Sequence, residues 1–192
     1  MKKEEVRKVV RQGYAQVAKK GAKAMIREFN GKSPKIAPSA FVSEAAYIVG
    51  DVEIGENSSV WPGAVLRADF AKITIGNNTS IEDNCVVHGG TDIVIGDNTF
   101  IGHGAVVHCR RIGNNVLVGN NATVLDGAEV GDFCIIGAGS VVAPETKIPD
   151  KSLAMGVPAD IEGQLSQKHL AWMENGLVSY TELAQKYKQQ GL

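Results

Sequence analysis

An aliphatic residue recurs at almost every sixth position between Ile36 and Ile148, and this period constrains the fold more than any other feature of the chain. The step departs from six at three places only, where it is nine, eight and five residues long. An amphipathic α-helix would repeat its apolar residues with a period of 3.6, so the pattern argues against helix here. The aliphatic positions are Ile36, Val42, Ile48, Ile54, Val60, Leu66, Ile75, Ile81, Val87, Ile95, Ile101, Val107, Ile112, Val118, Val124, Val130, Ile136, Val142 and Ile148.

Each six-residue unit suits one short strand followed by one turn. The residue four places after the aliphatic one is usually small, as at Ala64, Cys85 and Ala105, so each unit would point one bulky and one small side chain inward. Three units close a triangular coil, and the parallel strands of successive coils would stack about 4.8 Å apart. A single coil cannot bury its apolar face, whereas a stack of coils can. The repeat therefore predicts a mainly β protein, a parallel β-helix that occupies residues 31–160.

The N-terminal segment lies outside the repeat. Residues 1–30 place Val6 and Val10, among other apolar residues, roughly on one helical face, which predicts a helical extension. Pro34 and Pro38 then break any helix before the repeat begins.

The C-terminal segment also departs from the repeat. Residues 161–192 read as helix, and Tyr180, Ala184 and Tyr187 have helical spacing. We expect this segment to pack along a flank of the β-helix, with a break near Gly176.

The overall composition excludes several classes of protein. The formal net charge is −1, so no strong positive field is available for nucleic acid. No apolar run has the length of a membrane span or of a signal peptide, which favours a cytoplasmic protein without membrane contact. Three cysteines, an odd number without tight spacing, argue against a disulfide framework. Cys85 and Cys134 occupy small inward positions, and Cys109 is not expected to bind metal.

The phase of the repeat shows where the histidines lie. His88, His108 and Arg67 each directly follow an aliphatic residue, and these aliphatic residues are three units apart. The three side chains therefore belong to one face, on successive coils. His103 follows its aliphatic residue by two positions and belongs to the next face, with Asp83 on the coil below it.

Within a single chain, we expect an edge of the triangle to separate the two histidines on one face from the one on the next. They would meet if copies packed side by side, and a cyclic trimer provides three such interfaces. Three imidazoles with an open fourth position form the usual site of a hydrolytic or hydrating zinc enzyme. Each residue also has a plain interpretation, because a single histidine is often a solvated turn residue. Arg67 and Asp69 are equally well explained as an ion pair between subunits.

The motifs around these histidines resemble those of one known family. They are VWPGAVLRADFAKITIGNNTSIEDNCVVHGG, IGHGAVVHC, VLDGAEVGDFCIIGAGSVV and SLAMGVPA. An R-x-D motif followed by I-x-D-x4-H and G-H-x4-H is much more specific than the six-residue repeat alone. From about Ile36 to the C-terminus, the chain resembles the γ-class carbonic anhydrases. The resemblance implies a left-handed β-helix, because hexapeptide-repeat proteins are the known exception to right-handed crossovers.

The resemblance also implies a ligand set and a reaction. His88, His103 and His108 match the zinc ligands, although Fe²⁺ or Co²⁺ would suit the same ligands. The implied reaction is the reversible hydration of CO₂ to bicarbonate by metal-bound hydroxide, at the interfaces of a homotrimer.

Further residues match the family's catalytic positions. Arg67 and Asp69 match the pair that organises the interface, and Asp83 matches the aspartate near the metal-bound solvent. Glu82 stands where the prototype has glutamine, and Tyr180 matches a tyrosine of the terminal helix.

The chain departs from the prototype in two places. Phe70 replaces the glutamate that follows the R-x-D aspartate, and the segment Gly89–Val94 is short, so the acidic loop that carries a proton shuttle is absent. Because each hydration must export a proton, these departures predict turnover that is slow, buffer-dependent or absent.

Two other functions remain open from the sequence. Hexapeptide acyltransferases, or a thioesterase acting on a coenzyme A thioester, share the repeat and need a histidine base but not three converging histidines. A non-catalytic metal-binding trimeric scaffold would hold the metal without turnover. Sensitivity to a chelator separates the acyltransferase from the metalloenzyme.

Overall fold

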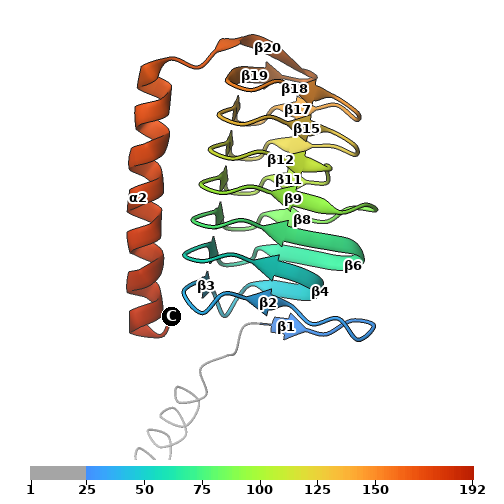
Figure 1. Cartoon of the computed structure of the whole chain (residues 1–192), viewed down its shortest axis with the longest axis vertical. Helices are drawn as coiled ribbons and strands as arrows, with labels where there is room; N and C mark the ends of the chain where they lie inside the picture. The colour runs from blue at the N-terminus through green and yellow to red at the C-terminus, as the bar shows by residue number, and fades with distance from the viewer. Residues whose placement is uncertain (1–24) are drawn as a thin grey trace, which may run out of the picture.

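The computed structural model describes residues 25–192 and shows a stack of coils built from short strands, with one long helix beside it (Figure 1). Its strands form a 12-stranded sheet and an 8-stranded sheet, and every pairing between successive coils is parallel. The fold is the mainly β parallel β-helix that the six-residue repeat predicts.

The larger sheet covers two faces of the triangular coil. The first face contains β8 (Val86–Val87), β11 (Val106–Val107), β14 (Thr123–Val124) and β17 (Val141–Val142). The second face contains β2 (Lys35–Ile36), β9 (Ile93–Ile95), β12 (Arg111–Ile112), β15 (Glu129–Val130) and β18 (Lys147–Ile148). Two long strands, β4 (Tyr47–Ile54) and β6 (Val65–Ile75), run through both faces and join them.

The smaller sheet forms the third face. It contains β3 (Phe41–Val42), β5 (Ser59–Val60), β7 (Ser80–Ile81), β10 (Phe100–Ile101), β13 (Leu117–Val118), β16 (Ile135–Ile136), β19 (Ser152–Gly156) and β20 (Ala159–Gln164). The last of these strands pairs antiparallel with β19 and ends the stack.

The register between coils matches the phase of the repeat. Val87 pairs with Leu66 on the coil below and with Val107 on the coil above. On the third face, Ile101 pairs with Ile81 and with Val118. The prediction that aliphatic residues three units apart share a face is therefore confirmed.

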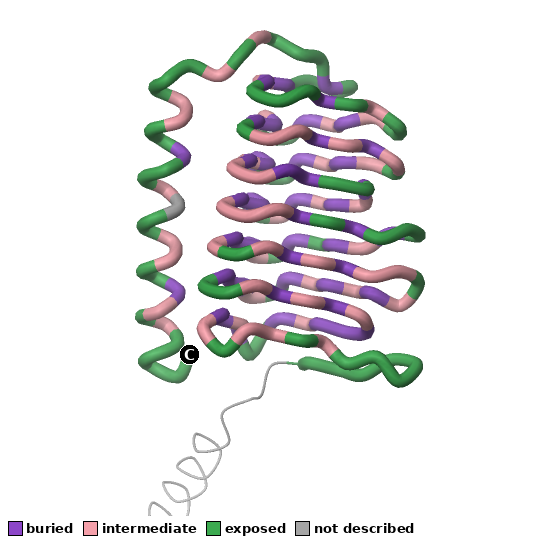
Figure 2. Tube along the Cα trace, in the orientation of Figure 1, coloured by how far each residue is buried: buried purple, intermediate pink, exposed green. Residues whose placement is uncertain are grey.

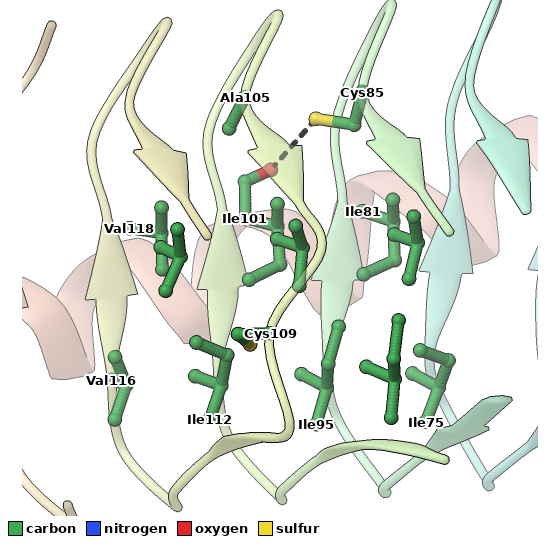
Figure 3. Packing of buried hydrophobic residues seen from close by; sticks show 14 of the residues in the cluster. Ile75, Ile81, Cys85, Ile95, Ile101, Ala105, Cys109, Ile112, Val116 and Val118 are labelled. Carbon is green, nitrogen blue, oxygen red and sulfur yellow. Dashed lines mark hydrogen bonds between the residues drawn. The ribbon is translucent and has the colours of Figure 1, made fainter. Parts of the chain in front are cut away.

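These aliphatic side chains fill the interior of the β-helix. Figure 2 shows buried residues at regular intervals along the coils, and Figure 3 shows Val118, Ile101 and Ile81 aligned in one row across successive coils. Each fully buried aliphatic side chain contributes about 1.5–3 kcal/mol by leaving water. The small inward positions are filled as expected, since Cys85 and Cys134 are fully buried. Cys109 is also buried in this core, with 1% of its surface exposed.

A glycine allows the two long strands to pack closely. The register of β4 with β6 shifts between Gly50 and Val52. Gly50 has φ of +85°, and a Cβ atom there would lie 2.2 Å from the carbonyl oxygen of Ala68. Only glycine fits this approach without strain.

The prediction of an N-terminal helical extension over residues 1–30 is tested only by the last residues of that segment, from Met25 onward. Residues 1–24 lie outside the described residues, so the expected helical extension is not seen there. Residues Met25–Arg27, which the same prediction included, form strand β1 and pair parallel with β4. The helical prediction is wrong for these three residues, because a free strand edge of β4 was available for pairing.

The C-terminal helix differs from its prediction in two ways. It begins later, since α2 spans Gln167–Gln190, and it continues through Gly176 without a break. Ser166 caps its N-terminus in a capping box with His169, and Gly191 ends it with φ of +72°. No helix within residues 25–192 is both long and apolar enough to cross a bilayer.

Aromatic packing holds α2 against the third face. Trp61 lies with its ring centroid 5.2 Å from that of Tyr187 and 5.9 Å from that of Tyr180. Phe41 and the fully buried Ala184 complete this cluster. This packing of α2 on the third face places Tyr180 near the β7 and β10 coils, where Glu82 and His103 lie.

Candidate metal centre

The first-face cluster comprises Arg67, Asp69, His88, His108 and Asp126. His88 and His108 directly follow β8 and β11, which pair in register. Their ring centroids are 5.3 Å apart, with an angle of 57° between the ring planes. The two histidines are therefore stacked neighbours, as the phase of the repeat predicted.

Carboxylates orient both of these imidazoles. Nε2 of His88 lies 3.1 Å from Oδ1 of Asp69, whose other oxygen is ion-paired with Arg67. Burial is the largest single influence on the pKa of Asp69 and acts to raise it, but the hydrogen bonds from Arg67, His88 and the backbone, together with the Arg67 charge, lower that pKa overall. On the other side of the cluster, Nδ1 of His108 lies 2.9 Å from Oδ1 of Asp126, which leaves Nε2 of His108 as the nitrogen available to a metal.

The third-face cluster comprises Glu82, Asp83, His103 and Tyr180. Glu82 and Asp83 follow β7, and His103 follows β10 on the next coil. Nε2 of His103 lies 3.1 Å from Oε2 of Glu82, and its Nδ1 lies 3.0 Å from Oδ2 of Asp83. The backbone N–H of His103 also donates to Oε2 of Glu82, at 3.1 Å. To act as a metal ligand, this imidazole would have to give up one of its two carboxylate contacts.

Glu82 is the buried carboxyl of this cluster, with 6% of its surface exposed. Its pKa is raised, chiefly because burial disfavours the charged form. The Tyr180 hydroxyl donates a hydrogen bond to it, and burial together with the nearby Glu82 charge raises the pKa of Tyr180 to about 12. The helix thus places a protonated phenol against the carboxylate that holds His103.

The predicted site residues fall into two groups on different faces. One chain brings together Arg67, Asp69, His88 and His108, and it separately brings together Glu82, Asp83, His103 and Tyr180. Within residues 25–192 of one chain, no group of three or more His, Cys, Asp and Glu side chains is arranged to hold a metal ion.

One contact residue was missed from the sequence. Asp126 is part of an Asp-Gly turn, which is a sufficient reason for an aspartate, so its type gives no functional signal. Its position two residues after Val124, on the coil above His108, is the signal that identifies it.

Comparisons with known proteins agree with this architecture. Residues 111–144 match the profile of the bacterial transferase hexapeptide (six repeats), and residues 92–107 match that of the hexapeptide repeat of succinyl-transferase. A crystal structure of a hexapeptide transferase family protein from Anaplasma phagocytophilum has a TM-score of 0.82 and 35% identity, covering 85% of this chain and 98% of that one. The chain is a hexapeptide-repeat β-helix protein.

Two curated relatives define the family more narrowly. A carbonic anhydrase from Geobacillus kaustophilus is 40% identical over 85% of this chain and 91% of its own length. The mitochondrial gamma carbonic anhydrase 2 of Arabidopsis thaliana is 38% identical over 80% of this chain, and the match spans 58% of that protein's length. The chain belongs to the γ-class carbonic anhydrase-like family of hexapeptide-repeat proteins.

Proposed function

We propose that this chain catalyses the reversible hydration of CO₂ to bicarbonate at a metal shared between two copies. In this proposal, His88 and His108 of one copy and His103 of another hold the ion. The observation that carries the proposal is the division of the three histidines between two faces, each histidine being held by carboxylates. The relatives named carbonic anhydrase support the reaction.

The donor set fits Zn²⁺. Imidazole nitrogen is a common zinc ligand, and a carboxylate on the opposite ring nitrogen fixes the tautomer, as Asp126 does for His108. A bound zinc ion supplies Lewis-acid activation of water near neutral pH. Because Fe²⁺ and Co²⁺ also accept imidazole, the ligands alone do not select zinc.

The carboxylates of the third-face cluster would accept the proton that hydration releases and transfer it to solvent. Hydration consumes one CO₂ and one water and releases one bicarbonate and one proton. Glu82 is buried beside His103, whereas the Asp83 side chain is 40% exposed and reaches solvent. Glu82 would accept the proton within the site, and Asp83 would pass it to buffer. Phe70, 76% exposed beside His88, cannot accept a proton, so we expect turnover to depend on buffer concentration.

A cyclic homotrimer would assemble these parts. If three β-helices pack side by side, each interface joins the first face of one copy to the third-face cluster of the next. Arg67 and Asp69 lie on the first face beside His88, so their ion pair would lie at that interface.

The test combines metal analysis with stopped-flow CO₂ hydration. We expect about one metal per chain, and loss of both metal and turnover in His88→Ala, His103→Ala and His108→Ala. His169→Gln, on the N-terminal turn of α2, is the matched control and should retain both. Full metal content in His103→Ala, or turnover without metal, would overturn the proposal.

A second candidate is acyl transfer or thioester hydrolysis, which the similarity to a transferase-family structure favours. Such an enzyme would retain its activity in the presence of a strong chelator, whereas CO₂ hydration would be lost. A trimer that binds metal but shows neither activity would instead be a scaffold.

A further inference from the structure

A cavity of about 660 Å³ lies between the third face and α2, and the hydration of CO₂ gives no reason for its size. CO₂ has three atoms, whereas cavities of 300–1,000 Å³ are typical of sites for much larger ligands. The third face contributes apolar side chains from three successive coils, Phe100, Leu117 and Ile135. The helix contributes Trp172 and Met173.

The cavity has a polar end and an apolar end. Glu82 and His103 come from the β7 and β10 coils, and Tyr180 meets them from the helix. Ile135 comes from the β16 coil, three coils beyond β7, which is roughly 14 Å along the axis at a spacing of about 4.8 Å. A ligand that filled the cavity would therefore be elongated, with one polar terminus.

Gly176 keeps the helical wall of the cavity open. Glycine inside a helix is less favourable than alanine, so its presence needs a reason. A Cβ atom at this position would lie 3.7 Å from Cζ of Phe100, which is ordinary contact, so close packing does not require glycine. A longer side chain would extend into the cavity. Glycine at position 176 therefore serves to keep the cavity open, and its backbone flexibility is not needed there.

The charged residues that line the cavity determine which charge the head group of a ligand can carry. The cavity wall contains the Glu82 carboxylate and no lysine or arginine. An anionic head group would therefore lose its hydration without gaining a cationic partner from the wall that this chain provides. The Asn120 side-chain amide offers a neutral donor to a carbonyl oxygen.

We infer that this cavity binds an uncharged acyl compound, such as an amide or ester, with its aliphatic chain between α2 and the third face and its carbonyl toward His103. The inference rests on the proposed function only in that His103 belongs to both sites. Binding of the ligand's aliphatic chain requires no metal, so the inference can be tested apart from CO₂ hydration.

The test is calorimetric titration of the full chain, freed of metal by a chelator, with hexanamide, octanamide and octanoate. Octanamide should bind saturably with one site per chain, and each added methylene should tighten binding by about fourfold. Octanoate should bind at least roughly tenfold more weakly, because no lysine or arginine in the cavity wall offsets the desolvation of its carboxylate. Equal affinity for the amide and the acid, or no binding of octanamide, would overturn the inference.

Two substitutions at one position supply the structural control. Gly176→Leu should abolish octanamide binding by filling the cavity, while Gly176→Ala should retain it and raise the melting temperature. Circular dichroism verifies that both variants fold. Unchanged binding in Gly176→Leu would overturn the inference. A Gly176→Leu protein that changes its oligomeric state would also overturn it, because the cavity would then be an interface between copies.

Discussion

Nδ1 of His108 lies 2.9 Å from Oδ1 of Asp126, which follows the strand directly above on the first face. This contact fixes which imidazole nitrogen remains free, so it should strengthen metal binding without adding a ligand. We expect Asp126→Asn to weaken metal affinity by about 10–100-fold, the usual effect of losing such a partner.

The measurement is a competition titration against a chromophoric chelator. Asp160→Asn, an exposed aspartate of β20, is the matched control and should leave affinity unchanged. Equal affinities for the wild type and Asp126→Asn would show that the contact does not orient the ligand.

Mixing two inactive variants tests whether His103 acts across an interface. His103→Ala and His88→Ala chains should each bind little metal as homotrimers. When they are unfolded, mixed equally and refolded, an interface is complete if the His103→Ala chain supplies the first face and its neighbour supplies His103. Random assembly makes about a quarter of interfaces complete, so about a quarter of wild-type metal binding should return.

A site built within one chain predicts a different result. Every chain in the mixture would lack one ligand, so no mixing ratio would restore binding. Metal content is a better readout than turnover, because it tests the geometry whatever the reaction is.

Arg67→Ala should weaken assembly more than it weakens the fold. The Arg67 side chain is 42% exposed in the single chain, so solvent screens its ion pair with Asp69 and the pair contributes little to the fold there. At an interface the same loss would leave the Asp69 carboxylate without its cation. Sedimentation should show dissociation at higher concentration than for the wild type. Unchanged dissociation with lost turnover would assign Arg67 to catalysis alone.

The thiols should be unreactive while the protein is folded. Burial raises the pKa of Cys85 and of Cys109 to about 12, and it also raises the pKa of Cys134. At pH 8 the reactive thiolate is therefore negligible in the native state. Iodoacetamide should label none of them before urea is added and all three afterwards, as mass spectrometry would show. Rapid labelling of Cys109 in the folded protein would instead place its thiol at the surface beside His108.

Much of the fold follows from local rules that are visible in the sequence. A bulky residue every sixth position determines which side chains point inward and which residues stack, so the neighbourhood of His88 and His108 was predictable. The conformation of the turns is local too, since asparagines such as Asn57 and Asn78 adopt the left-handed conformation that they tolerate well.

The predictions that failed concern segments without the repeat. A break at Gly176 was expected because glycine weakens a helix, but packing of Tyr180, Ala184 and Tyr187 against the third face stabilises α2 across it. Residues 161–164 of strand β20 were predicted as helix, because the antiparallel pairing of β20 with β19 depends on where the stack ends. Neither effect is local in sequence.

The sequence by itself determined the coil, its register and the two histidine-bearing faces, because these depend on a six-residue period and on side-chain size. Only the tertiary structure decided how each imidazole is held, where the helix lies, and that a cavity remains beneath it. Those features depend on contacts between residues far apart along the chain, such as Glu82 with Tyr180, and no periodicity encodes such contacts.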